Sequence, residues 1–123
     1  MRPSRLQDYL AHIRQAAEEA CGFVSGMTRE GFEADVRTQK AVEMNLVVIG
    51  EAASRVLEHH ADFTRLHAHL PWREMRGMRN RMAHGYFEIN LDVVWSTVQT
   101  ALPALLVQLQ ALSVDDDEAS APG

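Results

Sequence analysis

Three long stretches of the chain repeat apolar residues every three to four positions, which is the spacing of one helix face and not of a strand. They cover about residues 4–24, 37–59 and 90–110, and a shorter helix is expected from Trp72 to the break at Gly85. No stretch alternates apolar and polar residues as a half-buried strand does. The pattern predicts an all-α fold over residues 1–112, an antiparallel helical bundle of four main helices plus short helical turns.

Residues with particular backbone preferences mark the ends of these helices. Asn90 is a good N-cap, and Pro71 suits the start of a helix because its missing N–H would have no partner there. The segment TREGFEAD (28–35) is predicted to form a short helical turn whose Phe32 docks onto the core. The segment HHADFTRLHAHLP (59–71) is predicted to be irregular or frayed helix.

Three features interrupt the simple helical pattern. Gly50 lies inside the central helix, where glycine costs about 1 kcal/mol relative to alanine, so a close approach of a second helix is expected there. Pro103 removes a backbone hydrogen bond to the Gln99 carbonyl and is expected to kink the last helix. The segment SVDDDEASAPG (113–123) has no apolar face and is predicted to be a disordered acidic tail.

Size and charge limit the kinds of site that the chain can carry. With 123 residues it can build one modest core, so a site is expected in a surface groove or at a subunit interface. The formal charge of −5 argues against non-specific coating of nucleic acid. Four of the eleven arginines nevertheless fall within nine residues, which leaves a local anion site open: Arg73, Arg76, Arg79 and Arg81.

Cysteine and histidine usage give little support to a metal or disulfide scaffold. Cys21 is the only cysteine and can form neither an internal disulfide nor a thiolate zinc cluster. His59-His60 and His67-Ala-His69 match no established ligand spacing, so no metal site is expected. The chain has no signal-peptide pattern and no run of about 18 apolar residues, and a cytoplasmic protein is expected.

The helix from Trp72 to Gly85 carries the densest polar chemistry. At about 100° per residue, Arg76, Asn80 and His84 stand above one another on one face. Arg79 projects from the flank of the apolar face, where Glu51 or Glu74 could be its ion-pair partner. Arg79 and His84 are about 140° apart, so a shared site requires the arginine to reach around, the helix to end at Gly85, or a second subunit to complete it.

These side chains suit the cleavage of RNA by its own 2′-hydroxyl. A histidine can take or give a proton near neutral pH, and a guanidinium can hold two phosphate oxygens. DNA lacks the 2′-hydroxyl and is expected to survive. From the residues alone, His84 is better explained as a helix-terminal histidine favoured by the dipole, and Arg79 as a structural ion-pair residue.

The sequence around these residues resembles a known family. Arg79-Asn80, three further residues and His84-Gly85-Tyr86 form the pattern R-x4-H-x-Y of HEPN-domain toxins of the HepT-like family, which pair with a minimal nucleotidyltransferase (MNT) antitoxin. The segments NLVVIGEA (45–52), PWREMRG (71–77) and VW (94–95) are similar as well. The resemblance covers about residues 4–110.

The resemblance implies a homodimer that acts as a metal-independent endoribonuclease without a cofactor, the toxin of a type VII toxin–antitoxin system. It implies that Arg79 and His84 are catalytic, that Asn80 supports the site, and that the antitoxin transfers AMP to Tyr86 and thereby neutralises the toxin. The expected partners are RNA and the antitoxin, and neither DNA nor a membrane is expected to bind. Possible contacts to the RNA are Arg73, Arg76 and Arg81. The alternative is a non-catalytic helical binding subunit of a nucleotidyltransferase.

Overall fold

The structure is a computed structural model that describes the backbone of residues 5–84 and 88–120 and the side chains of residues 5–82 and 88–112. The described residues form helices and no strand, as the sequence predicts. The elements are α1 (Arg5–Phe23), α2 (Arg29–Glu33), α3 (Val36–His59), α4 (Ala61–Leu66), α5 (Trp72–His84), α6 (Leu91–Ser96), the π-helical turn η2 (Thr97–Ala101) and α7 (Leu102–Ser120).

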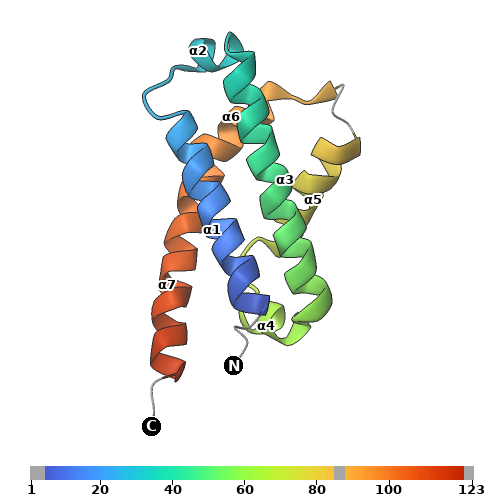
Figure 1. The fold of residues 1–123 in the computed structure, drawn as a ribbon, viewed down its shortest axis with the longest axis vertical. Coiled ribbons are helices and arrows are strands. Elements are labelled where there is room, and N and C mark those ends of the chain that lie inside the picture. The colour runs from blue at the N-terminus through green and yellow to red at the C-terminus, as the bar shows by residue number, and fades with distance from the viewer. Residues whose placement is uncertain (1–4, 85–87, 121–123) are drawn as a thin grey trace.

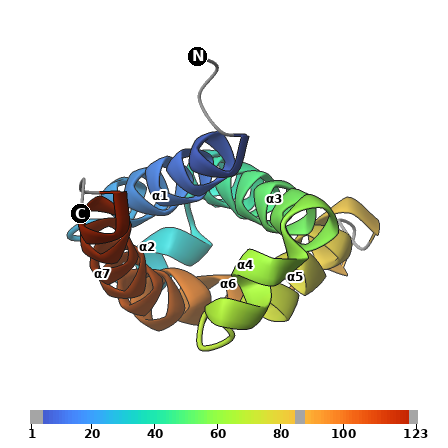
Figure 2. The same cartoon turned by 90° about the horizontal axis from the view of Figure 1, so that it is seen from below.

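The long helices surround a single core. In Figure 1, α1 and α3 run side by side in opposite directions, α5 lies on the far side of α3 and α7 on the far side of α1. The view from below shows these helices arranged around a common interior (Figure 2). The central helix α3 supplies the largest share of fully buried apolar side chains: Val42, Leu46, Ile49, Ala53 and Val56.

The predicted helix ends agree with the capping contacts in the structure. Asn90 Oδ1 accepts from the backbone N–H groups of Asp92 and Val93 at 2.9 and 3.3 Å and so begins α6. Pro71 directly precedes α5. Within 28–35, the short helix α2 forms as predicted, and its Phe32 is fully buried.

The last predicted helix is divided into α6, η2 and α7, and the chain changes direction between α6 and α7 (Figure 1). The N–H of Leu102 bonds to the carbonyl of Thr97, five residues back, which is a π-type bond. If the same π pattern continued, a bond from residue 103 would go to the carbonyl of Val98. The sequence predicts the carbonyl of Gln99, one residue later. Because Pro103 has no N–H to offer it, the Val98 carbonyl accepts instead from the Cys21 thiol, with Sγ and O 3.8 Å apart.

Helix α7 extends past Leu112 into the predicted tail, of which residues 121–123 lie outside the described part. α7 continues to Ser120, so the backbone is helical over residues for which the sequence predicts a disordered tail. No proline or glycine occurs between Pro103 and Pro122 to stop a helix. Leu112 is the last described core side chain, and the domain boundary there stays a prediction. No helix in the described part of the chain is both long and apolar enough to span a membrane.

Candidate functional site

The candidate site is built where α5 lies against α3. A Cβ placed on Gly50 would lie 2.1 Å from the Cβ of Arg79 and 2.7 Å from the carbonyl oxygen of Met75. Both distances are far below van der Waals contact, so only glycine fits between the two helices as they stand. The close approach expected from the glycine inside the central helix is confirmed.

This packing brings the Arg79 side chain across α3. Its Nη1 donates to Oε2 of Glu51 at 2.9 Å, and its Nη2 donates to Oγ of Ser54 at 3.3 Å. Of the two acidic partners that the sequence allows, the structure therefore selects Glu51. Ser54 was missed, although its spacing of four residues from Gly50 on the same helix was a usable signal. The Arg79 side chain is 30% exposed, which leaves part of it open to solvent.

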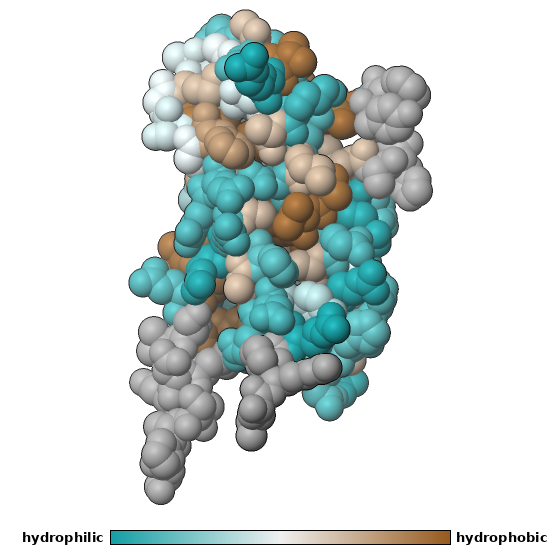
Figure 3. Space-filling view, in the orientation of Figure 1, coloured by the Kyte–Doolittle hydropathy of each residue, from teal (hydrophilic) through white to brown (hydrophobic). Residues whose placement is uncertain are grey.

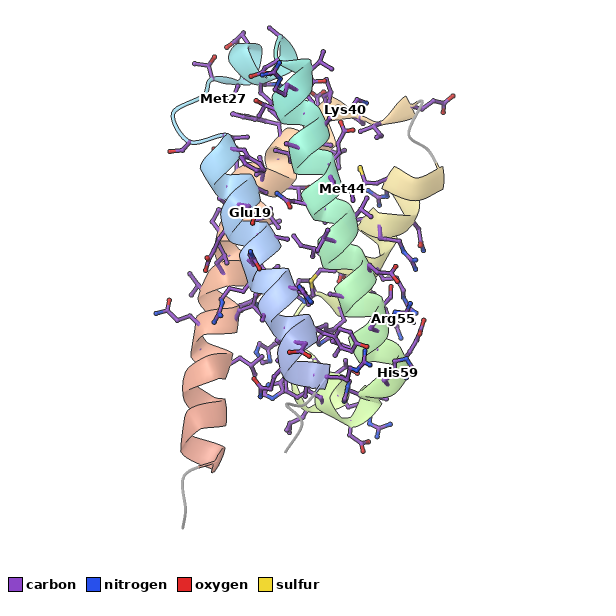
Figure 4. All side chains as sticks on the ribbon, viewed as in Figure 1. Glu19, Met27, Lys40, Met44, Arg55 and His59 are labelled. Atoms are coloured by element: carbon purple, nitrogen blue, oxygen red, sulfur yellow. The ribbon has the colours of Figure 1, made fainter. Side chains whose placement is uncertain are left out.

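Glu51 is itself held between two arginines. Its Oε2 pairs with Arg79, and its Oε1 lies 3.3 Å from Nη2 of Arg55, one turn further along α3. Figure 4 labels Arg55 on the lower half of this helix. One carboxylate shared by two guanidiniums leaves the group of three with a net positive charge, which favours an anionic ligand.

The hydrogen-bonding capacity of Arg79 is only partly used. Each terminal nitrogen carries two N–H groups and makes one bond to a described residue, so each has one donor without a partner among the described residues. The Nε atom is buried and has no partner among the described residues. N–H groups on a planar, partly exposed guanidinium that have no partner among the described residues are donors of the kind that bind phosphate oxygens.

The structure places only some of the predicted site residues. Arg79 and Asn80 are neighbours on α5, with Asn80 exposed. The backbone of α5 ends at His84, but the side chain of His84 lies outside the described part, as does the whole of Tyr86.

The remaining arginines of this segment lie along α5. Arg73 and Arg81 are exposed and Arg76 is half-buried, and none of the three makes an ion pair with a described residue. Arg81 lines a shallow pocket at the end of α5 together with Met82 and Ile89. The opposite face of the helix is apolar as predicted, and its methionines pack on the core: Met75, Met78 and Met82.

The four histidines of residues 59–69 have neighbouring side chains but form no metal-binding group within the described part of the chain. Nε2 of His59 lies 3.8 Å from a Glu58 carboxylate oxygen, and the rings of His67 and Phe63 are 4.5 Å apart. Over the described residues, no three side chains of histidine, cysteine, aspartate or glutamate come together as a metal-binding group.

Comparison with known proteins supplies the family. The family model described as Ribonuclease HepT-like matches residues 13–112. A protein of Thermococcus cleftensis named "Probable ribonuclease HepT" is 39% identical over 106 residues, which cover 86% of this chain and 94% of that protein. A protein of Caldanaerobacter subterraneus subsp. tengcongensis with an RNase name is 33% identical, over 85% of this chain and 90% of that protein. A protein of Methanocaldococcus jannaschii with an RNase name is 32% identical, over 87% of this chain and 86% of that protein. No solved structure matches. The chain belongs to the HepT-like ribonuclease family.

Proposed function

We propose that this protein is a metal-independent endoribonuclease, the toxin of a type VII toxin–antitoxin system of the cytoplasm. The observation that carries the proposal is the Arg79 guanidinium, which is oriented by α3, partly exposed and left with two donors that have no partner in the described part of the chain. It stands five residues before His84 on the same helix, in a chain of the HepT-like ribonuclease family. The ribonuclease names of the relatives support RNA as the substrate.

The proposed reaction divides the chemistry between two side chains. His84 removes the proton of a ribose 2′-hydroxyl, and the 2′-oxygen then forms a bond to the adjacent phosphorus. Arg79 stabilises the negative charge of the phosphorane, with Asn80 as a supporting polar group. The bond from phosphorus to the 5′-oxygen breaks, the protonated His84 gives its proton to the 5′-oxygen, and a 2′,3′-cyclic phosphate remains. This route needs neither a metal nor a cofactor.

The proposed active form is a homodimer. Because Arg79 and His84 are about 140° apart around a straight helix, a second subunit offers a way to complete one site. An apolar surface on α3 is compatible with association: Met44 is 61% exposed, and Val48, four residues on, is half-buried. Figure 3 shows an apolar patch on the face over α3.

The proposed partners are RNA and a cognate MNT antitoxin. Arg73, Arg76 and Arg81 would contact the RNA backbone as positive charges. The antitoxin would transfer AMP from ATP to the phenol oxygen of Tyr86 and release pyrophosphate. Added phosphate charge two residues from His84 would repel the RNA backbone and so neutralise the toxin.

The test uses the purified full chain with tRNA in EDTA. We expect fragments that end in 2′,3′-cyclic phosphate, no fragments from His84→Ala protein, and strongly reduced but measurable cleavage by Arg79→Ala protein. His59→Ala, which removes an exposed histidine of α3, is the matched control and should cleave as the wild type does. Loss of cleavage in EDTA would contradict metal independence. Intact RNA together with efficient AMP transfer to Tyr86 would instead identify a non-catalytic binding subunit of a nucleotidyltransferase.

A further inference from the structure

We propose that Glu51 and Ser54 are positioning residues that set the direction of the Arg79 guanidinium, an inference that rests on the ribonuclease function proposed above. Neither residue would touch RNA. Their role would be to hold the charged group of α5 from the neighbouring helix α3 before substrate arrives.

The geometry attaches Arg79 to α3 at both ends of its side chain. At the root, the position of Gly50 lets the Arg79 Cβ lie directly against the backbone of α3. At the tip, Glu51 and Ser54 accept from different terminal nitrogens, at 2.9 and 3.3 Å. Two acceptors on one rigid helix, three residues apart, fix the plane of the guanidinium and not only its position.

The carboxylate that holds Arg79 is held in turn. Oε1 of Glu51 pairs with Arg55, which leaves Oε2 for Arg79. An arginine side chain otherwise has many rotamers, and ordering it during the reaction would raise the barrier. A misplacement of about 1 Å can cost about 100-fold in rate, so a preset guanidinium is a large advantage.

A purely structural ion pair is the competing explanation. The Arg79 side chain is 30% exposed and that of Glu51 45% exposed. Ion pairs in such solvent-screened positions contribute little to stability. A structural pair therefore predicts nearly unchanged cleavage when Glu51 is replaced, whereas a positioning pair predicts a large loss of rate in a protein that remains folded.

The first experiment measures single-turnover RNA cleavage and melting temperature for Glu51 variants. We expect Glu51→Ala to lower the cleavage rate by about 10- to 100-fold while the melting temperature falls by less than about 4 °C. Glu51→Gln keeps an oxygen acceptor and should lose less, as should Ser54→Ala. The matched control is Glu58→Gln, two turns further along the same exposed face of α3, which should cleave at the wild-type rate.

The second experiment asks whether Glu51 acts through Arg79. In an Arg79→Ala background, Glu51→Ala should cause no further loss, because the group that it orients is gone. An equal fold-loss in both backgrounds, or a wild-type rate for Glu51→Ala in otherwise active protein, would overturn the inference while leaving the ribonuclease function intact.

A third measurement does not depend on activity. In ¹⁵N NMR spectra of the full chain, the Arg79 side chain should show hindered rotation of its guanidinium, and Glu51→Ala should release it. Free rotation in the wild type would overturn the positioning role whether or not RNA is cut. Hindered rotation in a protein that cuts no RNA would show that Glu51 and Ser54 hold the Arg79 guanidinium, but it would refute the ribonuclease function.

Discussion

Gly50 sits where the backbone of α5 leaves no room for a side chain. We expect Gly50→Ala to destabilise the protein by about 1–3 kcal/mol, because the new methyl group would overlap the Cβ of Arg79 and force the helices apart. The same displacement would move Arg79 away from Glu51 and so reduce cleavage. Urea unfolding gives the first quantity and a single-turnover assay the second.

Gly77 on α5 offers the matched control for this substitution. Within the described part of the chain, nothing lies within 4 Å of a Cβ built there. Gly77→Ala should therefore stabilise the protein by about 0.4–1 kcal/mol through the smaller entropy of its unfolded chain. If both substitutions changed stability alike, the close contact at Gly50 would not be the reason for its glycine.

Cys21 is expected to be an unreactive thiol. Burial raises its pKa above the usual value, and its S–H donates to the Val98 carbonyl. At pH 8 the folded protein should react with iodoacetamide more slowly than the protein unfolded in urea. Since the folded pKa is raised, the thiol's contribution to stability is present below the unfolded pKa and is lost as pH rises through the folded pKa. Equal alkylation rates in both states would contradict this.

At the scale of elements, the first turn of α3 depends on one titrating cap. Asp35 accepts from the Thr38 N–H at 3.0 Å and from the Thr38 hydroxyl at 2.7 Å. The side-chain bond to Thr38, followed by the backbone bond, lowers the pKa of Asp35 below its ordinary range. The stability from this cap is therefore present above the unfolded pKa and lost as pH falls through the folded pKa.

Asp35→Asn separates the titration from the cap. Asparagine also caps helices well but does not ionise in this range. The melting temperature of the wild type should exceed that of Asp35→Asn at pH 7, and the difference should shrink as the pH is lowered below about 4. A difference that stayed constant down to pH 2 would show that the charge of Asp35 plays no part.

The sequence predicted the helices of this fold better than the interruptions within them. Apolar periodicity and caps such as Asn90 depend on neighbours in the chain, which a sequence displays directly. The π turn before Pro103 depends instead on a contact with α1, where Cys21 meets the carbonyl of Val98. Such a contact between distant segments leaves no local pattern, so the sequence points to the carbonyl of Gln99 and not to that of Val98.

The candidate site was predictable in its members more than in its geometry. The pattern R-x4-H-x-Y predicts Arg79 as a site residue, and Glu51 is one of the two acidic residues that the sequence offers as its partner. Ser54 is not among the predicted site residues. Its inclusion would have required knowing which side of α3 packs against α5, because that packing decides which residues of α3 lie next to Arg79. Gly50 lies at this contact, but the distances from Gly50 to Arg79 and Met75 can be measured only when the backbones of both helices are known.

At the scale of the whole molecule, the separation of Arg79 and His84 around α5 makes the assembly testable. If a proposed site takes its arginine from one subunit and its histidine from the other, then two impaired chains can restore activity together. In a heterodimer of Arg79→Ala and His84→Ala chains, one site would contain both changes. The other would contain both native residues.

An equal mixture of the two variants should therefore regain about a quarter of the wild-type rate, since about half of the dimers are mixed and each has one intact site. The subunits are refolded together, and cleavage is compared with each variant refolded alone. Size-exclusion chromatography with light scattering establishes that dimers are present in every sample. If each site instead used both residues of one subunit, every site in the mixture would carry one change and no activity would return. Absence of dimers in the wild type would contradict the proposed assembly itself.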